Sequence, residues 1–322
     1  MDLVPAEGPI LDEILASTYD IWNEGLSRRA YPNYYKGQLA TAWGRARLTR
    51  TALVDRGQVL TSAKEYFFDA ALDGRSIRVV GLGAVFTQPQ HRGGGHARVL
   101  LQRLIDRATG HGCDLALLFS EIGPGYYASL GFTPVPTFNL ELRVREDARR
   151  GAPALLVRAG DDRDLDAIVA MDRARARGYR LHLDRDRDLV QYAIAKRRLL
   201  AGLGAPGERH LDFFVAEEGA SAVAYAVILK RRSMWTLDSA GDRDPAGARL
   251  GAILQTLIAR DPAEARPTLD AWLPPAFRPP QIEIVGERVP KDVMMIRPLT
   301  ARGTPATPLG RDEALYWRSD LF

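Results

Sequence analysis

The chain has 322 residues (35.6 kDa), of which 46% are hydrophobic and 26% charged, as expected of a folded protein with about two domains. Its 44 basic and 40 acidic residues give a net charge of +4 and alternate along the chain, which argues against a nucleic-acid partner. A single cysteine, Cys113, excludes an internal disulfide and a cysteine-rich zinc site, and we expect no metal. Because the sequence has neither a run of about 18 apolar residues nor a basic leader, we expect a cytoplasmic protein without a membrane partner.

The first part of the chain predicts a helix followed by an antiparallel sheet. Apolar residues recur at helical spacing over residues 9–19, and Trp22 extends that face. A polar, aromatic segment follows, from Tyr31 to Trp43. Strand-like runs then alternate with Arg-Gly and Asp-Gly turns, which predicts a meander over residues 48–55, 59–72 and 77–87.

The next segment changes to a helical period. Apolar residues share one face from residue 92 to residue 110. Residues 115–119 are continuously apolar, which is typical of a central strand covered on both faces. A Gly-Pro-Gly break leads into a short helix with Tyr126 and Tyr127, and residues 138–144 alternate like a final strand.

The second half repeats this order of elements after a polar linker at residues 146–153. Its predicted strands cover residues 155–158, 213–217, 222–237, 268–273 and 293–296, and its predicted helices cover residues 164–177, 189–200 and 250–258. The segment 130–136 is also echoed at 285–290. We therefore infer a duplicated domain, with domains at 1–148 and 149–299 and a tail at 300–322 whose apolar end packs back onto the protein.

A glycine-rich turn joins the third strand of the meander to the next helix. Gly93, Gly94 and Gly95 let backbone amides approach a ligand closely, and the first amides of a helix lack internal partners and attract anions. A diphosphate suits this geometry. A P-loop would need Gly-Lys-Ser/Thr where His96 and Ala97 stand, and a Rossmann turn would not follow an antiparallel meander.

Two motifs carry a family resemblance. Residues 92–97 (Arg-Gly-Gly-Gly-His-Ala) resemble the acetyl-CoA signature Arg-x-x-Gly-x-Gly/Ala of the GCN5-related N-acetyltransferases (GNAT), and residues 126–132 resemble that family's later Phe-Tyr-x-x-x-Gly-Phe motif. The resemblance covers residues of about 45–145. The chain also resembles tandem acetyltransferases of the enhanced-intracellular-survival (Eis) type in its duplicated layout, in the Pro-x-His-Arg before the glycines and in Ser120-Glu121. Residues 118–123 resemble the corresponding segment of fungal-type lysine N-acetyltransferases.

The resemblance implies an α+β chain of two tandem GNAT folds, each a mixed, mainly antiparallel sheet flanked by helices. It implies direct transfer of an acetyl group from acetyl-CoA to a primary amine of a small cationic acceptor: an amino acid such as lysine, a polyamine or an aminoglycoside-like amine. Eis-type enzymes have a third, sterol-carrier-like domain for which this sequence is too short, so substrate range and a homo-oligomer stay open. A non-catalytic acyl-CoA-binding sensor on the same fold is the alternative.

The resemblance also implies the residues that bind acetyl-CoA. The backbone of the strand end would hold the pantetheine arm, one of its amides would polarise the thioester carbonyl, and the glycine turn would hold the diphosphate. A polar side chain after the apolar strand would add a hydrogen bond. In chain order these residues are Val85, Phe86, Thr87, Arg92, Gly93, Gly94, Gly95, His96, Ala97, Arg98 and Ser120.

Three residues are candidates for the proton transfers. Tyr127 is the expected general acid, because an ordinary tyrosine and a thiol have similar pKa values, about 10 and about 8.5. Glu121 either hydrogen-bonds the cofactor or receives the proton of the amine. The Eis-type resemblance places the carboxyl group of Phe322 in the active site as a base. Each of these roles has a structural alternative: Tyr127 serves packing alone, Glu121 is a surface charge unrelated to catalysis, or the tail simply docks through its apolar residues.

For other segments the sequence predicts structural roles or leaves alternatives open. Gly81 and Gly83 suggest a bulge, a close approach or plain packing in their strand, and Cys113 is expected to be structural. In the second half, Asp242 and Asp244 stand where the glycine turn should be, so we predict that this copy binds no CoA and forms a wall of the acceptor cleft. Either a pocket for the acceptor or core packing accounts for the aromatic-rich residues Tyr31, Tyr34, Tyr35, Trp43, Glu65, Tyr66, Phe67 and Phe68.

Overall fold

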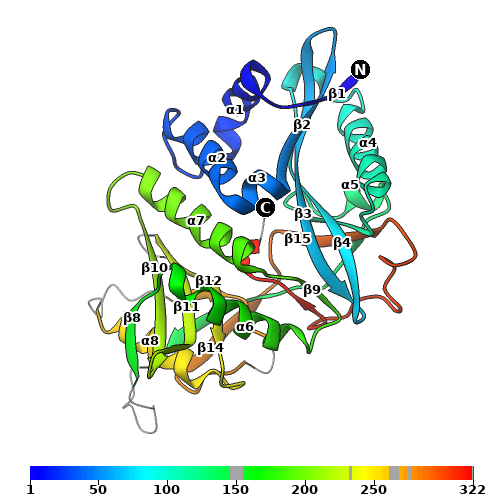
Figure 1. Ribbon diagram of the computed structural model, residues 1–322. Coiled ribbons are helices and arrows are strands. Elements are labelled where there is room, and N and C mark those ends of the chain that lie inside the picture. The colour runs from blue at the N-terminus through cyan, green and yellow to red at the C-terminus, as the bar shows by residue number, and fades with distance from the viewer. Residues whose placement is uncertain (146–154, 232–233, 261–267, 275–276, 321) are drawn as a thin grey trace.

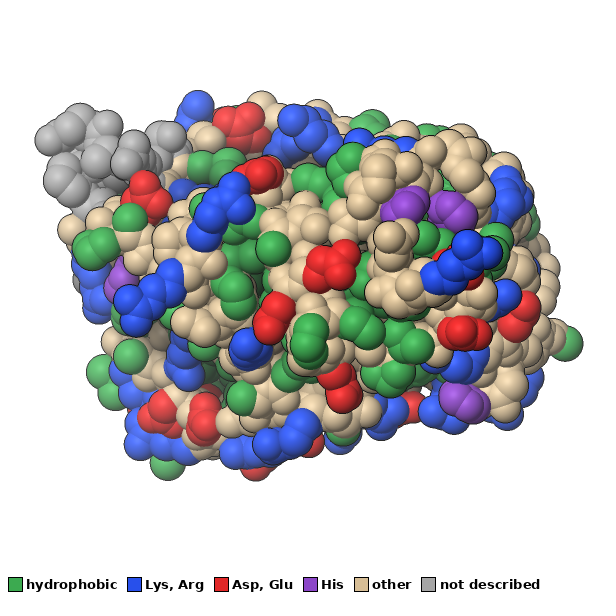
Figure 2. All heavy atoms as spheres, turned by 90° about the horizontal axis from the view of Figure 1, so that it is seen from above, with side chains coloured by type: hydrophobic (Ala, Val, Ile, Leu, Met, Phe, Trp, Pro, Cys, Tyr) green, Lys and Arg blue, Asp and Glu red, His purple; other side chains and the backbone are tan. Residues whose placement is uncertain are grey.

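The computed structural model describes residues 1–145, 155–231, 234–260, 268–274, 277–320 and 322, so the predicted linker at 146–153 lies outside the described residues. The described strands form two sheets that lie one above the other in Figure 1, each flanked by helices. On the face seen in Figure 2, acidic and basic side chains are interspersed. None of the described helices is both long and apolar enough to cross a membrane.

The first sheet contains the predicted meander. Its strand order is β1-β2-β3-β4-β5-β15-β6, and β9 pairs with both β3 and β16. The meander is antiparallel, whereas β4 and β5 are parallel. The strands are β1 (Asp2–Pro5), β2 (Leu48–Asp55), β3 (Gln58–Leu72), β4 (Arg75–Thr87), β5 (Leu115–Ser120), β6 (Thr133–Pro134), β9 (Leu181–Leu183), β15 (Val293–Pro298) and β16 (Ala314–Leu315).

Helices cover both faces of this sheet (Figure 1). On one face the apolar stripe of α4 packs on Val80, Leu82 and Ala116, which buries the side predicted from its period. The other face carries α1, α2 and α3, the last two formed by the aromatic segment for which no element was predicted. The helices are α1 (Gly8–Trp22), α2 (Ala30–Ala40), α3 (Ala42–Arg47), α4 (His96–Gly110) and α5 (Gly125–Ala128).

The second sheet repeats the plan. Its order is β14-β7-β13-β12-β11-β10-β8, with only the β12–β13 pair parallel among its described pairs. The predicted fold class, mixed and mainly antiparallel sheets flanked by helices, is confirmed. The elements are β7 (Asn139–Val144), β8 (Leu156–Ala159), α6 (Leu165–Ala176), α7 (Arg187–Leu203), β10 (Arg209–Glu218), β11 (Ser221–Arg231), β12 (Met234–Asp242), α8 (Ala248–Ile258), β13 (Leu269–Ala271) and β14 (Ile282–Arg288).

The two sheets exchange their last strands. β7, from the first half of the chain, pairs antiparallel with β13 and β14 in the second sheet. β15, from the second half, pairs antiparallel with β5 and β6 in the first sheet. The predicted domain limits, 1–148 and 149–299, divide the chain into two halves. The two sheets do not follow this division, because each contains a strand from the other half.

The tail is held between the halves. β16 pairs with β9, Trp317 is only 2% exposed, and the ring of Tyr316 lies 5.2 Å from that of Trp272. Its apolar end therefore lies in the core shared by both sheets.

Candidate functional site

The first element of the site is an opening between β4 and β5. The two strands pair from Val79↔Leu115 to Gly81↔Leu117, although β4 continues to Thr87 and β5 to Ser120. Beyond that point β4 bulges, because two of its residues, Ala84 and Val85, lie opposite a single residue of β3, and Ala84 has a φ of 47°. The β5-facing edge of β4 at residues 85–87 therefore has no strand partner among the described residues.

The glycine turn lies at the end of this opening. Gly93 and Gly95 have φ values of 81° and 73°, and α4 begins at His96. A Cβ at either glycine would meet nothing within 4 Å, so backbone conformation rather than space requires glycine there. The amides of residues 93–98 donate no hydrogen bond to the part of the chain that the structure describes. The turn thus presents free donors at a helix N-terminus.

The charged and polar residues near the turn have protein partners. Arg92 and Arg98 are exposed; Arg92 donates to the Thr87 carbonyl at 3.3 Å, and Arg98 donates to the Ser129 hydroxyl at 2.6 Å. Ser120 is buried and donates to the Gly123 carbonyl at 2.6 Å. Arg98 therefore joins α4 to the residue after α5, and Ser120 fixes the turn between β5 and α5.

Tyr127 stands on α5 beside the opening. Its ring lies 5.1 Å from that of Tyr126 and 6.1 Å from that of Phe132. Burial, and to a smaller extent Tyr126, raises the pKa of Tyr127 to about 12. Tyr127 is therefore a weaker acid than the ordinary tyrosine assumed from the sequence, and it stays protonated at neutral pH.

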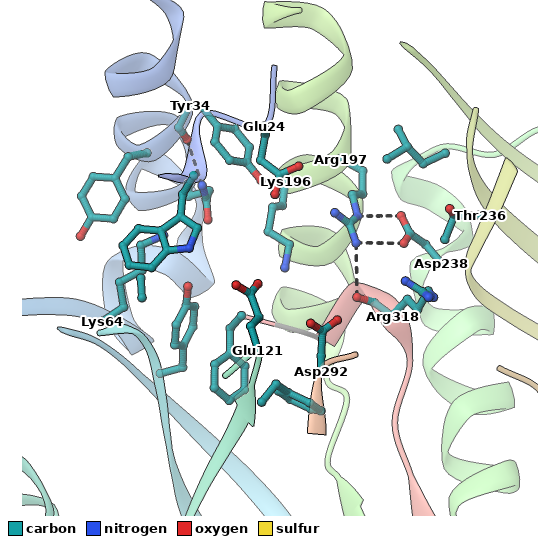
Figure 3. Close-up of a pocket in the computed structure, with 18 of the residues that line it drawn as sticks. Glu24, Tyr34, Lys64, Glu121, Lys196, Arg197, Thr236, Asp238, Asp292 and Arg318 are labelled. Atoms are coloured by element: carbon teal, nitrogen blue, oxygen red, sulfur yellow. Dashed lines mark hydrogen bonds and ion pairs between the residues drawn. The ribbon is translucent and has the colours of Figure 1, made fainter. Parts of the chain in front are cut away.

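A cavity of about 510 Å³ connects these elements to the second half of the chain (Figure 3). Val85, Glu121 and Tyr127 line it from the first half, together with the bulge residue Ala84. The second half and the tail contribute Lys196, Arg197, Thr236, Asp238, Asp270, Asp292, Arg318 and Phe322. The sequence predicted that the second half forms a wall of the acceptor cleft, but of these individual residues it predicted Phe322 alone.

Acidic side chains face the cavity beside Tyr127. Glu121 and Asp292 lie next to each other in Figure 3, and neither forms an ion pair with a described residue. Burial, followed by the charge of Asp292, raises the pKa of Glu121. Asp238 differs, since Arg197 pairs with it at 2.6 Å. Two neighbouring carboxylates without a partner favour a cation between them.

Phe322 packs directly on β4. Its ring lies 4.7 Å from that of Tyr66 and 5.4 Å from that of Phe119. A side chain at Gly81 would collide with this ring, and a Cβ at Gly83 would lie 3.0 Å from the carboxyl carbon of Phe322. The two glycines therefore permit a close approach, and the bulge follows directly after them.

The aromatic-rich residues divide between the two roles that the sequence leaves open. Tyr31, Tyr34, Tyr35 and Tyr66 line the cavity, whereas Trp43, Phe67 and Phe68 pack in the cores. Glu65 does not line the cavity: it is fully buried and accepts hydrogen bonds from Thr51 and Arg107, each at 2.6 Å. Cys113 is buried, which raises its pKa.

In the second half, the equivalent turn has its amides occupied by a side chain of the protein. Gly247 precedes α8 with a φ of 84°, as Gly95 precedes α4. Here the Asp242 carboxylate accepts hydrogen bonds from the amides of Asp244 (2.8 Å), Arg249 (2.8 Å) and Leu250 (2.9 Å). A carboxylate of the chain thus takes up donors that remain free in the first half.

Comparisons with known proteins agree with this geometry. Residues 15–135 match the family described as an acetyltransferase (GNAT) domain, and no curated protein matches the chain. A GCN5-related N-acetyltransferase from Kribbella flavida is similar in structure, with a TM-score of 0.68 and 18% identity over 92% of this chain and 70% of that one. Eis1 from Mycobacterium abscessus gives a TM-score of 0.55 and 14% identity over 93% of this chain and 74% of that one.

A tandem GNAT protein from the clavulanic acid biosynthesis pathway is also similar. Its TM-score is 0.52 with 15% identity, over 93% of this chain and 98% of that one. These likenesses cover 92–93% of this chain, so the fold extends beyond the segment matched by the family. The chain therefore contains a GNAT domain, matched at residues 15–135, and its fold as a whole is similar to that of Eis1 and of the tandem GNAT protein.

Proposed function

We propose that this protein transfers an acetyl group from acetyl-CoA to the primary amine of a small cationic acceptor, such as an amino acid, a polyamine or an aminoglycoside-like amine. The observation that carries the proposal is the continuity of the site. Free amides at residues 93–98 adjoin the unpaired edge of β4, and that edge leads to a cavity containing Tyr127, Glu121 and Asp292.

The residues around the opening fit the three parts of the cofactor. The amides from Gly93 to Arg98 suit the diphosphate, with the exposed charges of Arg92 and Arg98 beside them. The backbone of Val85, Phe86 and Thr87 suits the amide-bearing pantetheine arm as an added strand would. The amide of Val85, within the bulge, is our candidate for polarising the thioester carbonyl.

Acetyl-CoA supplies the thioester: the bond between nitrogen and the acyl carbon forms while the bond between carbon and sulfur breaks. Tyr127, which is protonated at neutral pH, gives its phenolic proton to the departing sulfur, although its raised pKa makes it a weaker acid than an ordinary tyrosine. After the products leave, solvent returns a proton to Tyr127 and takes one from Glu121. Glu121 takes the proton that the amine loses. Burial favours this role, because a raised pKa brings a carboxylate closer to a useful base.

The carboxyl group of Phe322 is our second candidate for the proton acceptor. It lies over Gly83, two residues before Val85 in the strand that faces the cofactor. An ordinary terminal carboxyl has a pKa of about 3.5, so this group needs desolvation or an intervening water to act as a base.

The test is acetyl-CoA turnover with a panel of amino acids, polyamines and aminoglycosides. We expect CoA release with at least one primary amine, and a roughly hundredfold lower kcat in Tyr127→Phe, the scale of a lost general acid. Acetyl-CoA affinity should stay unchanged in that variant, and Tyr126→Phe, the exposed neighbour, should keep its activity. Full activity in Tyr127→Phe would remove the acid role. Cofactor binding without turnover of any amine would favour the non-catalytic sensor.

A further inference from the structure

Two cationic side chains lie directly opposite each other in the first sheet. Arg50 on β2 pairs in register with Lys64 on β3, and both line the cavity. The guanidinium carbon of Arg50 lies 5.9 Å, and the Lys64 ammonium 5.0 Å, from the centre of the Tyr35 ring. Like charges at directly opposite positions destabilise a sheet, so the pair needs a compensating reason.

The protein does not neutralise this pair. Arg50 is only 4% exposed, and its Nε and Nη2 atoms donate to no described residue. Lys64 forms no ion pair with a described residue, and Glu24, the carboxylate whose charge reaches it, pairs with Arg231 at 3.1 Å. Burial, and then the charge of Arg50, lowers the pKa of Lys64 to about 7. A bound anion would relieve all of these unfavourable features.

Lys64, and across the cavity Glu121 and Asp292, form no ion pair with a described residue, whereas Arg197 and Arg318 pair with Asp238 and Asp270. Lys64 lies on one side of the view in Figure 3, with Lys196 of α7 directed into the space between, and Glu121 and Asp292 lie across from Lys64. The carboxyl group of Phe322 lies over Gly83, the ladder partner of Lys64, and does not form an ion pair with Lys64. A ligand that matches this pattern carries a positive and a negative group at separate ends.

We propose that Arg50 and Lys64 form an anion subsite for the acceptor, which is therefore an amino-carboxylate. This inference rests on the proposed function, since it places the reacting amine beside Glu121 and Asp292. The carboxylate contacts the Lys64 ammonium, and Arg50 adds its charge from behind. A carboxylate matches buried cations in charge and in hydrogen-bond geometry.

The test compares amino-carboxylates with their decarboxylated counterparts. The pairs are L-lysine with 1,5-diaminopentane, L-ornithine with 1,4-diaminobutane, and 6-aminohexanoate with pentylamine. We expect the protein to favour the carboxylate member of at least one pair at least tenfold, in kcat/KM and in calorimetric affinity. Lys64→Met should reduce that preference at least tenfold by raising KM, with little change in kcat and in the values for the decarboxylated amine.

Further variants separate the subsite from general damage. Arg50→Met should act in the same direction as Lys64→Met, and Lys64→Arg should retain part of the preference. Lys36→Met, on the exposed side of the helix that carries Tyr35, is the matched control and should behave as the unmodified protein. No preference in any pair, or an equal loss for both members in Lys64→Met, would overturn the proposal.

Failure of the anion subsite and failure of the proposed acetyl transfer give different results in these experiments. If carboxylate-dependent binding is lost in Lys64→Met but no amine is acetylated, the anion subsite stands and the transfer reaction falls. If amines are acetylated without regard to their carboxylate, the transfer reaction stands and the subsite falls. If no member of any pair binds or reacts, the subsite is rejected.

Discussion

At the scale of single residues, Lys64 is held at a cost to stability. Its pKa is about 7 in the folded protein against 10.5 for an ordinary lysine. Between these values the unfolded chain holds a proton that the folded chain lacks, so the free energy of unfolding rises with pH through this window. The penalty is complete below pH 7 and disappears above about pH 10.5.

Lys64→Met should therefore stabilise the ligand-free protein, and more so at low pH. Each pKa unit corresponds to about 1.4 kcal/mol, so we expect the gain at pH 6.5 to exceed that at pH 9.5 by a few kcal/mol at most. Denaturant unfolding of both proteins at the two pH values measures this difference. Lys36→Met, an exposed lysine, should show no such dependence. An equal gain at both pH values would show that packing rather than charge is responsible.

The residues of the site differ in how far the sequence predicts them. Gly93 to Gly95 and Tyr127 could be singled out from the sequence because they stand in local motifs. The pairing of Arg50 with Lys64 depends on strand register, which the motifs do not contain. One signal was present in the sequence. Arg50 is two residues from both Leu48 and Ala52, so it lies on the same face of the strand as these apolar residues, and a charge stands on a buried face. Lys196, Asp238 and Asp292 reach the cavity only through the packing of the halves.

At the scale of elements, α4 and α8 differ at their N-termini, because the amides are free at α4 and bound by the Asp242 carboxylate at α8. Because the Asp242 carboxylate accepts three amides at α8, we expect one coenzyme A per chain in a calorimetric titration. Asp242→Ala leaves these donors without a partner and should lower the free energy of unfolding by about 2–3 kcal/mol, without adding a second CoA. Asp242→Asn, which keeps an acceptor oxygen, should lose less. Two CoA molecules bound to the unmodified chain would contradict the assignment.

The tail is a second element with a testable anchor. Arg185, only 6% exposed, pairs with Asp172 at 3.1 Å and with Asp320 at 3.4 Å, and Asp320 also accepts from the Trp317 amide at 3.0 Å. Asp320→Ala should destabilise the protein by about 2 kcal/mol, because Arg185 keeps one partner. It should also lower kcat/KM about tenfold or more by displacing Phe322 from β4.

A second variant tests whether the ring of Phe322 is the group that the Asp320 anchor holds in place. Phe322→Ala keeps the backbone of the tail and removes only the ring over Gly81, so thermal stability should fall less than in Asp320→Ala. Turnover measured beside thermal unfolding separates the two effects. Unchanged turnover in both variants would show that neither the Asp320 anchor nor the Phe322 ring contributes to the reaction.

Periodicity predicted the long elements well and the short ones poorly. The strand at 48–55 agrees with β2 at both ends, since alternation and turn residues mark it. The segment that forms α2 contains a proline and a glycine and has little amphipathic character. It is stabilised instead by α7 of the other half: a Cβ at Gly37 would meet the Leu199 side chain at 2.9 Å, and Tyr192 donates to Gln38 at 3.1 Å. The strands β1, β9, β14 and β16 likewise depend on distant partners.

At the scale of the whole molecule, the exchange of β7 and β15 joins the two halves. The duplication in the sequence suggested two self-contained units, because the echo of segments 130–136 and 285–290 places each final strand after its own half. Pairing partners are not encoded in that echo. Since β15 lies between β5 and β6, and β7 lies between β14 and β13, each sheet has an interior position filled by the other half.

We therefore expect the halves to fold only together. Without β15, residues 1–148 leave β5 with an unpaired edge inside a sheet, and residues 149–322 lack β7 in the same way. The full chain should unfold in one calorimetric transition whose enthalpy equals the van't Hoff enthalpy, while each half alone should give no sharp transition. Mixing the two halves should restore a sharp transition, because each half then supplies the strand that the other lacks. Two separate transitions in the full chain would mean that the exchanged strands do not couple the halves, and the cavity between them would then open without unfolding either sheet.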